Sequence, residues 1–273
     1  TLINKIRYKK ILFLYLLFFI FWYNMFRGIF MQTNTHDFHD IVINLSLMID
    51  KRIVDEIDEK EYIRHIETYV RHVDNLYIYN MTHQDLSSFY EKLNKYENIY
   101  YTMMDDYGEV QNYQFLLEHL LSTNCDFGVV LRSVYYYEED AFLSMRRYLT
   151  EKDTSKIAVL TPLPLRGCEL FNLNVEETRN CKGCNLVGTF INMKIFKELS
   201  PLKLEYYQSM FDYEYCIRAR SKGYLIKLMQ NEVLRNQNYK IVEKKFFFIN
   251  LATYDYDLMD LYYQTRNRFY LWD

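Results

Sequence analysis

The sequence predicts an α/β protein: a Rossmann-like, mixed but mostly parallel sheet flanked by helices, with an N-terminal hydrophobic helix. Strand-like and helix-like segments alternate along residues 40–131, and such alternation implies parallel strands joined by crossover helices. The chain has 273 residues with Gly 7 and Pro 3, which favours one compact domain without long linkers. Residues 11–23 are uninterrupted apolar and aromatic sequence. We therefore expect an anchor helix and linker over residues 1–36 and one domain over residues 37–273.

The N-terminal segment predicts a retained membrane anchor. Its apolar run extends to residue 31 if Asn24, Arg27 and Gly28 are tolerated, which approaches the roughly 20 residues that a bilayer needs. No small-residue cleavage site follows, so a cleaved leader is disfavoured, and a buried or interfacial helix is the alternative. The basic residues within 5–10 predict that this flank stays cytoplasmic while the rest of the chain crosses, although docking on the inner face is also open. The expected localisation is membrane-associated, with the side of the membrane undetermined.

The elements of the domain follow in order along the chain. Short runs rich in β-branched and aromatic residues predict strands, and longer runs with an apolar stripe predict helices. The expected strands are residues 40–45, 75–79, 98–103 and 127–131, and the expected helices between them are residues 58–72, 86–96 and 111–121. Further on, residues 212–222 predict a helix and residues 224–229 a strand. Ligands of open sheets bind outside the carboxyl ends of the strands, so the loops there are the expected site.

Charge and cysteine content narrow the classes of function. The formal net charge of -3 disfavours a nucleic-acid polymer as partner. Aromatic residues make up 18% of the chain, but a biased composition produces the same excess, so it assigns no function. Cys181 and Cys184 have the spacing of half a zinc knuckle. Because a structural zinc needs four ligands and no histidine is near, a disulfide or two free thiols is expected instead.

The segment 211–224 has the most specific chemical pattern. Asp212 and Glu214 lie roughly 200° apart on a helix, because each residue turns the chain by about 100°, so their carboxylates have different tasks. Glu214 and Arg218 have the i, i+4 spacing at which an acid orients a guanidinium. Gly223 occupies the position where a helix takes a left-handed C-cap. On this pattern alone, a surface helix with ordinary charge pairs is an equally good interpretation.

This pattern, acid-x-acid-x-x-x-Arg-x-Arg-x-x-Gly-Tyr, resembles the C-terminal signature of family 2 glycosyltransferases, which have the GT-A fold, and especially their rhamnosyltransferase-like branch. The first acid of that signature is the general base that deprotonates the acceptor hydroxyl, so the resemblance implies this role for Asp212. Glu214 and Arg218 are then implied to orient the helix and its acceptor-side contacts. Residues 185–192 resemble the strand that precedes the acceptor site, and residues 261–270 resemble the Tyr-Tyr-x-x-Arg-Asn element of the rhamnosyl branch.

The loops after the second and third predicted strands resemble, less closely, the nucleotide-binding turns of the family. The first loop, residues 79–85, resembles the family's Asp-Asn-x-Ser-x-Asp turn, with Tyr79 where an Asp is usual. The second loop, residues 106–108, resembles the Asn-x-Gly turn beside the base and ribose. Asn, Asp and Gly are also ordinary turn residues, so their order relative to the strands is what gives them weight. The resemblance implies contacts to the nucleotide-sugar from Asn80, Thr82, Asp85, Asp106 and Gly108.

The metal-binding motif of the family is missing. A strand ending in Leu is followed there by Asp-x-Asp, whose carboxylates hold a divalent metal on the donor diphosphate, whereas Leu131 precedes Arg132-Ser133-Val134. Mg²⁺ or Mn²⁺ needs oxygen ligands, and the nearest acids are Glu138, Glu139 and Asp140. Alternatively, Arg132 replaces the metal, because a guanidinium binds phosphate oxygens bidentately and stays charged. The protein would then be metal-independent. Loss of activity is the third alternative.

The expected function is that of an inverting glycosyltransferase in polysaccharide biosynthesis. It would move a sugar from a nucleotide-sugar donor to a hydroxyl of a glycan or lipid-linked acceptor at the membrane, with Asp212 as general base. One alternative is a catalytically inactive glycosyltransferase-like binding or scaffold protein at the membrane, paired with itself or with an active transferase. A nucleotide-binding regulator without sugar chemistry is another. The sugar, nucleotide, acceptor, membrane orientation and oligomeric state stay open.

Overall fold

The computed structural model describes residues 41–49, 59–138, 140–166, 174, 176–237, 241–246, 249–254 and 258–271. The chain divides into two units, Thr1–His39 and Asp40–Asp273, and every element below belongs to the second. The expected N-terminal anchor helix and Glu139 lie outside the described residues. Among the helices within the described ranges, none has both the length and the apolar character needed to cross a membrane.

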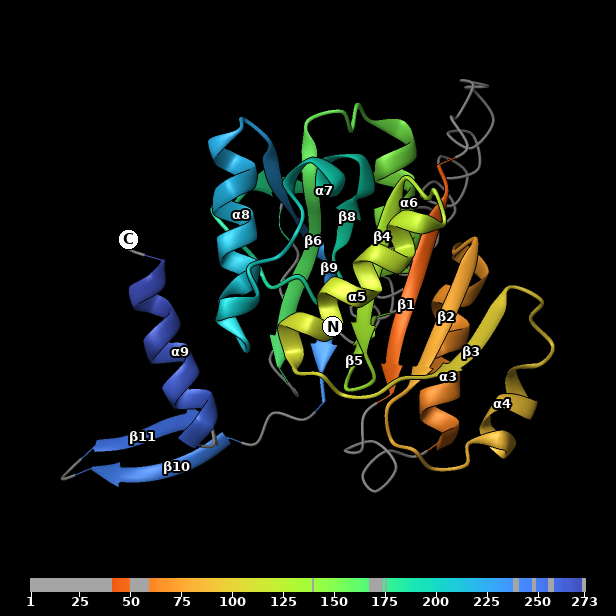
Figure 1. The fold of residues 1–273 in the computed structure, drawn as a ribbon, viewed down its shortest axis with the longest axis horizontal. Coiled ribbons are helices and arrows are strands. Elements are labelled where there is room, and N and C mark those ends of the chain that lie inside the picture. The colour runs from red at the N-terminus through yellow and green to blue at the C-terminus, as the bar shows by residue number, and fades with distance from the viewer. Residues whose placement is uncertain are drawn as a thin grey trace, which may run out of the picture. The chain divides into compact units, whose positions relative to one another are not determined.

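Within the described residues, nine strands form a central sheet (Figure 1). Its order is β3-β2-β1-β4-β8-β6-β9-β5, with β7 paired to β9 outside this path. The strands are β1 (Ile43–Ile49), β2 (Asn75–Asn80), β3 (Ile99–Met103), β4 (Phe127–Arg132), β5 (Tyr135–Tyr137), β6 (Ile157–Arg166), β7 (Thr178–Asn180), β8 (Phe190–Asn192) and β9 (Leu225–Asn236). A separate antiparallel ladder joins β10 (Ile241–Phe246) and β11 (Ile249–Tyr254).

The first four strands form the parallel half of the sheet that the alternating pattern predicts. β1 pairs in parallel with both β2 and β4, and β2 pairs in parallel with β3. The connecting helices are α3 (Glu59–Tyr69), extended by the 3₁₀ turn η1 (Val70–His72), α4 (Ser87–Leu93) and α5 (Glu109–Ser122). The carboxyl ends of these four strands therefore lie at one edge of the sheet, where the predicted loops gather.

The expected boundary of the first strand was wrong. The sequence pattern predicts residues 40–45, whereas β1 covers Ile43–Ile49 with every residue buried. A central strand that is covered on both faces shows no alternation of polar and apolar residues, so its end cannot be recognised from the pattern. Met48, near the true end of the strand, reaches the pocket described below.

The second half makes the sheet mixed. β8 pairs antiparallel with both β4 and β6, and β5 and β7 pair antiparallel with β9. β6 and β9 run parallel, and their register shifts between Pro162 and Leu163. The mixed α/β architecture predicted from the sequence is thus confirmed for the described residues.

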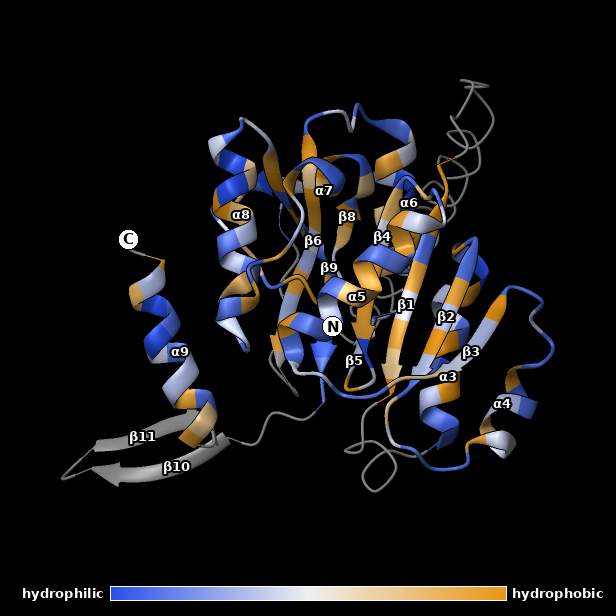
Figure 2. Ribbon diagram, viewed as in Figure 1, coloured by the Kyte–Doolittle hydropathy of each residue, from blue (hydrophilic) through white to orange (hydrophobic). Residues whose placement is uncertain are grey.

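Helices cover both faces of the sheet. α5 contacts β1 and β4 and packs against α7 (Met193–Leu199), which in turn packs against α8 (Phe211–Ser221), and these helices lie in front in Figure 1. α3 packs against α4 and α6 (Ala141–Glu151). The turn η2 (Leu204–Tyr206) precedes α8, and α9 (Leu258–Tyr270) ends the described chain. Figure 2 shows β4 largely in the hydrophobic colours, consistent with the burial of Phe127–Leu131 within the core.

Candidate functional site

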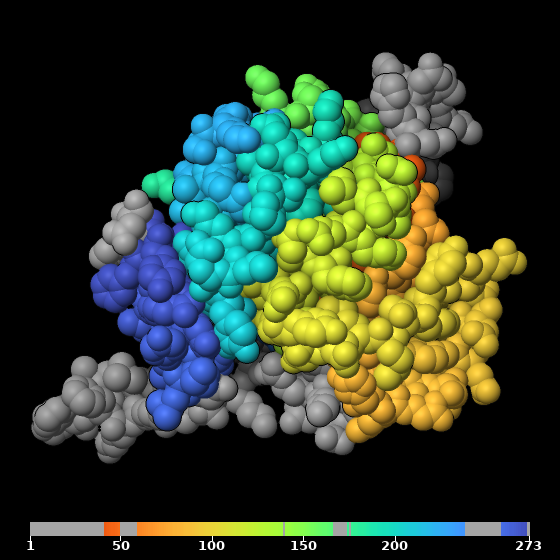
Figure 3. Space-filling view, viewed as in Figure 1, coloured from red at the N-terminus to blue at the C-terminus, as the bar shows by residue number. Residues whose placement is uncertain are grey.

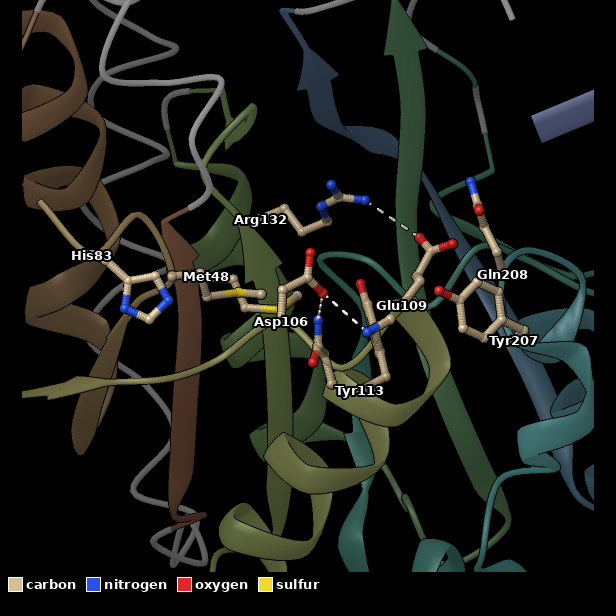
Figure 4. Close-up of a pocket in the computed structure, with 11 residues that line it drawn as sticks. Met48, His83, Asp106, Glu109, Tyr113, Arg132, Tyr207 and Gln208 are labelled. Carbon is tan, nitrogen blue, oxygen red and sulfur yellow. Dashed lines mark hydrogen bonds and ion pairs between the residues drawn. The ribbon is translucent and has the colours of Figure 1, made fainter. Parts of the chain in front are cut away.

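A pocket of about 430 Å³ lies at the carboxyl ends of the parallel strands (Figure 4). Residues at the end of β1, after β2, after β3 and at the end of β4 form one side, and the loop before α8 forms the other. This is the position at which open α/β sheets bind ligands. The lining residues are Met48, Met81, His83, Asp106, Gly108, Glu109, Asn112, Tyr113, Arg132, Tyr207 and Gln208.

The turn after β3 is shaped by Asp106 and Gly108. One carboxylate oxygen of Asp106, Oδ1, accepts hydrogen bonds from the Gly108 amide at 3.0 Å and from Asn112 Nδ2 at 2.8 Å (Figure 4). Gly108 has φ +96, and a Cβ there would lie 3.0 Å from the ring of Tyr207. A side chain at this position is therefore excluded both by the left-handed backbone and by the closeness of Tyr207. Both predicted residues of this turn line the pocket.

Arg132 provides the cation of the pocket wall. It is the last residue of β4 and lies with its Nη1 3.4 Å from Glu109 Oε1 (Figure 4). The other oxygen, Glu109 Oε2, accepts a hydrogen bond from the Ser209 amide at 3.2 Å. Glu109 therefore joins Arg132 to the loop before α8, and this pairing offsets one of the acidic charges beside the pocket.

Tyr113 contributes a buried hydroxyl group to the same wall. Its side chain is fully buried on α5, and within the described residues its hydroxyl oxygen has no hydrogen-bond partner. Burial raises the pKa of Tyr113 well above its usual value, so the group is a neutral donor. An unsatisfied buried hydroxyl costs free energy.

The turn after β2 behaves differently from the expectation. Asn80 Oδ1 accepts hydrogen bonds from the amide and the hydroxyl of Thr82, at 2.9 and 2.7 Å, and Asn80 Nδ2 donates to the Gln84 carbonyl at 2.9 Å. Both side chains are buried inside the turn, while Asp85 is exposed and binds Ser87. None of the three lines the pocket, whereas Met81 and His83 from the same turn do.

Asp212 lies buried in the first turn of α8. It is the second residue of α8 and is 6% exposed. Burial raises its pKa to about 7, with a further increase from Glu109 and an opposing hydrogen bond from the Tyr213 amide at 2.9 Å. Its charge interacts with Glu109 and Tyr113, which line the pocket, although Asp212 is not itself a lining residue. A carboxyl group with this pKa exchanges protons near neutral pH.

A second pocket of about 310 Å³ lies beside the same helix. Its wall includes Tyr213, which follows Asp212, and Cys184, whose pKa is raised mainly by a hydrogen bond to Cys216 and also by the charge of Asp212. Asn185 from the predicted acceptor-side segment lines it as well. Cys181 and Cys184 are free thiols in this structure, which is the second of the two expected alternatives. Asp212 thus has lining residues of both pockets as neighbours.

Glu214 and Arg218 form an ion pair away from these pockets. Their atoms Oε1 and Nε lie 2.8 Å apart, and Glu214 also lies 3.4 Å from Lys203 Nζ. Arg218 donates to the carbonyl of Leu199 at the end of α7. The pair ties α8 to the segment after α7, and neither residue lines the two pockets described here.

The weak candidates for a metal site are engaged elsewhere. Glu138 forms an ion pair with Arg235, and Asp140 lies in the left-handed region at the start of α6. Across the described ranges, no group of three or more His, Cys, Asp or Glu side chains is placed to hold a metal ion. At the expected motif position Arg132 offers a cation and Val134 an apolar group. The residues present therefore do not fit the metal site of the resembled family.

Only Asp106, Gly108 and Arg132 among the lining residues were predicted from the sequence, and eight were not: Met48, Met81, His83, Glu109, Asn112, Tyr113, Tyr207 and Gln208. Tyr113 lies within a regular helix, and Tyr207 and Gln208 lie in a loop without a recognised motif. The signal that could have found these two loop residues is the Tyr-Tyr-x-x-Arg-Asn element, because its Asn267 binds this loop.

The amino-acid sequence has little similarity to known proteins. No family model matches the chain. A curated relative, the Potassium channel K1 of Plasmodium berghei (strain Anka), is 28% identical over 215 residues, which make up 77% of this chain and only 10% of that protein. The chain thus spans about a tenth of the length of that relative.

Two solved structures share the fold. One is GalNAc-T7 with UDP, GalNAc and Mn²⁺, with a TM-score of 0.54 and 9% identity over 73% of this chain and 44% of that one. The other is S. aureus TarS 1-349 in complex with UDP-GlcNAc, with a TM-score of 0.52 and 10% identity over 73% of this chain and 60% of that one. Both are glycosyltransferases, and the described domain has their GT-A-like fold.

Proposed function

We propose that the domain is an inverting glycosyltransferase that binds a nucleotide-sugar in the pocket at the strand ends and uses Asp212 as general base. The observation that carries the proposal is a buried carboxyl group with a pKa of about 7 whose charge interacts with Glu109 and Tyr113, two lining residues of the pocket at the carboxyl ends of the parallel strands. A general base is most effective when its pKa lies near the working pH.

The donor side is assigned to the wall that contains Asp106, Gly108 and Arg132. The fold neighbours with UDP and UDP-GlcNAc support a nucleotide-sugar as the ligand class. Asp106 and Gly108 shape the turn beside the nucleoside, and the neutral Tyr113 hydroxyl is a donor for an oxygen of the ligand. Asn80 and Thr82 hold the neighbouring turn that presents Met81 and His83 to the pocket.

Arg132 takes the place of the absent carboxylate motif. A guanidinium donates two parallel hydrogen bonds to phosphate oxygens, which stabilises the charge that grows on the departing diphosphate. The ion pair with Glu109 holds Arg132 at the pocket wall. No step is assigned to a divalent metal, because the donor set at the motif position does not fit one.

The proposed reaction uses Asp212 as the base. Its carboxylate accepts the proton of the acceptor hydroxyl while the acceptor oxygen bonds to the anomeric carbon. The bond from that carbon to the diphosphate breaks on the opposite face, which inverts the configuration. The second pocket, beside Tyr213 and Asn185, supplies the acceptor side. A hydroxyl of a glycan or lipid-linked sugar is the proposed acceptor, and membrane attachment through the N-terminal segment remains part of the proposal.

Substitution of Asp212 tests the base. Asp212→Asn keeps the size and the hydrogen bond from Tyr213, so we expect nucleoside diphosphate binding within about twofold of wild type and turnover of the accepted nucleotide-sugar lowered at least about 100-fold. The measurement is nucleoside diphosphate release against a panel of nucleotide-sugars, together with calorimetric titration. Transfer at the normal rate in this variant rejects the assigned base.

Substitution of Arg132 tests the diphosphate site. Removing a charge-assisted hydrogen bond predicts about a ten- to hundredfold weaker affinity for UDP, GDP or dTDP in Arg132→Ala, with the wild-type affinity unchanged by EDTA. Arg235→Ala is the matched control, since Arg235 is also a half-buried strand arginine paired to an acid and lines neither pocket. Binding that requires Mg²⁺ or Mn²⁺ contradicts the role of Arg132, and no nucleotide binding at all favours the scaffold alternative.

A further inference from the structure

The loop 206–210 has an unusual backbone for residues that are not glycine. Tyr207, Ser209 and Met210 have φ values of 55, 62 and 65, in the left-handed region. Such conformations cost free energy and persist only where the surroundings hold them. The loop supplies Tyr207 and Gln208 to the pocket and leads directly into α8, which begins at Phe211. Something outside the loop must therefore stabilise its shape.

Asn267 on α9 is the residue that binds this loop most extensively. Its side chain is fully buried, and Nδ2 lies 2.8, 2.7 and 3.0 Å from the carbonyl oxygens of Tyr206, Gln208 and Ser209. One amide group thus gathers three backbone carbonyls from four consecutive residues. Apolar or acceptor-only side chains at position 267 cannot replace it, because buried carbonyls without donors are costly.

Arg266 fixes the orientation of this amide. Its Nε and Nη2 atoms donate to Asn267 Oδ1 at 2.9 and 2.8 Å. Because a guanidinium has donors only, Oδ1 must face Arg266, and Nδ2 must face the loop. Arg266 Nη2 also donates to the Glu205 carbonyl at 2.6 Å.

Aromatic and polar contacts continue the same attachment. The guanidinium of Arg266 lies 4.7 Å from the ring centre of Tyr263, whose ring lies 5.0 Å from that of Tyr207. Gln208 donates to Asp260. In the space-filling view, α9 in dark blue lies directly against the cyan surface that contains this loop (Figure 3).

We infer that Asn267, oriented by Arg266, is a positioning residue: α9 holds the 206–210 loop in the shape that completes the pocket and sets the start of the helix bearing Asp212. The inference rests on the proposed function only for the identity of the pocket ligand. The loop itself is joined to the opposite wall by Glu109, which accepts from Ser209, and by the Val110 amide, which donates to Tyr207. Without Asn267, we expect the loop to lose its fixed shape and this wall of the pocket to become mobile.

The test is Asn267→Asp. This substitution keeps the shape of the side chain but replaces the Nδ2 donor by a carboxylate oxygen, an acceptor that faces the three carbonyl oxygens. The matched control is Asn44→Asp, since Asn44 is a buried amide hydrogen-bonded to Thr123 and Asn75 at the opposite end of β1. We expect amide hydrogen exchange of residues 207–211 to accelerate at least about tenfold in Asn267→Asp, and affinity for UDP, GDP or dTDP, whichever wild type binds, to fall at least about fivefold. Asn44→Asp changes neither readout. If Asn267→Asp does not fold, Arg266→Gln provides the same two readouts with a smaller expected change.

The outcomes separate this inference from the proposed function. Unchanged exchange at residues 207–211 overturns it, and so does faster exchange with unchanged nucleotide affinity. Equal changes in the Asn44→Asp control overturn it too, because a general loss of stability then explains them. Faster loop exchange in a protein whose wild type binds none of the three nucleotides supports the role of α9 and rejects the donor site.

Discussion

At the scale of single residues, burial raises the pKa of Asp212 and makes its charge costly to the fold. The pKa of about 7 in the folded chain lies above the ordinary value of 3.8, because desolvation penalises the carboxylate. Between these two pH values the folded state binds more protons than the unfolded state. The free energy of unfolding therefore decreases as pH rises from about 4 to about 7 and then levels off.

This linkage predicts the behaviour of Asp212→Asn. The variant and the wild type should have similar stabilities near pH 4, whereas at pH 8 the variant should be more stable by a few kcal/mol, since each unit of pKa shift corresponds to about 1.4 kcal/mol. Urea unfolding followed by circular dichroism between pH 4 and pH 8 measures the difference. A stability difference that does not grow with pH contradicts the raised pKa.

Tyr113 makes a second prediction at this scale. Tyr113→Phe removes a buried hydroxyl that has no hydrogen-bond partner among the described residues, so the free energy of unfolding should rise by about 1 kcal/mol, while nucleoside diphosphate affinity should fall about two- to tenfold. Tyr215→Phe is the control: Tyr215 is equally buried, its hydroxyl also has no hydrogen-bond partner in the part of the chain that the structure describes, and it lines neither pocket. Chemical unfolding and calorimetry give the two values. An unchanged affinity in Tyr113→Phe removes its hydroxyl from the binding role.

At the scale of elements, two glycines with a left-handed backbone connect segments, and each position requires glycine for a different reason. Gly223 follows α8 with φ +85 and open space around its Cα, as the expected C-cap, and this prediction is confirmed. Gly188 has φ +62 on the segment before β8, and a Cβ there would lie 2.6 Å from Leu234 on β9 and 3.3 Å from Leu131 on β4. Its amide also donates to Val130.

Alanine substitutions at these two glycines separate the cost of a strained backbone from the cost of a crowded core. Gly223→Ala should lower the free energy of unfolding by about 1 to 2 kcal/mol, the cost of a left-handed alanine. Gly188→Ala should lower it by about 1 to 3 kcal/mol more, because the methyl group also displaces Leu234 in a packed core. Equilibrium denaturation of both variants provides the comparison. Equal losses would show that the core beside Gly188 accommodates the methyl group.

Local sequence patterns predicted the helices and strands whose formation depends mainly on residues close in the sequence. β2 begins at Asn75 and α8 covers Phe211–Ser221, each within one residue of the expected limits. β6 was not expected, since Pro162 and Pro164 interrupt its pattern, yet the strand forms because it pairs with β9 on one side and β8 on the other. Tertiary pairing thus overrides local preference in β6.

At the scale of the whole molecule, the candidate site was predicted in part. Asp106 and Gly108 line the pocket because they follow a parallel strand, and Arg132 lines it because it ends one; strand order is a consequence of chain order. Asn80 and Thr82 have the same position relative to a strand but turn inward to bind each other. A residue type and a position in sequence do not determine which way a turn side chain faces.

The amino-acid sequence alone determined the alternation of strands and helices, the edge of the sheet where the pocket forms, and the acid at position 212, because these follow from periodicity and chain order. The tertiary structure decided that Asp212 is buried with a raised pKa, that Glu109 joins Arg132 to Ser209, and that Asn267 holds the loop beside the pocket. Those contacts join residues between 23 and 100 positions apart. Packing, not local pattern, sets the desolvation and hydrogen bonding on which they depend.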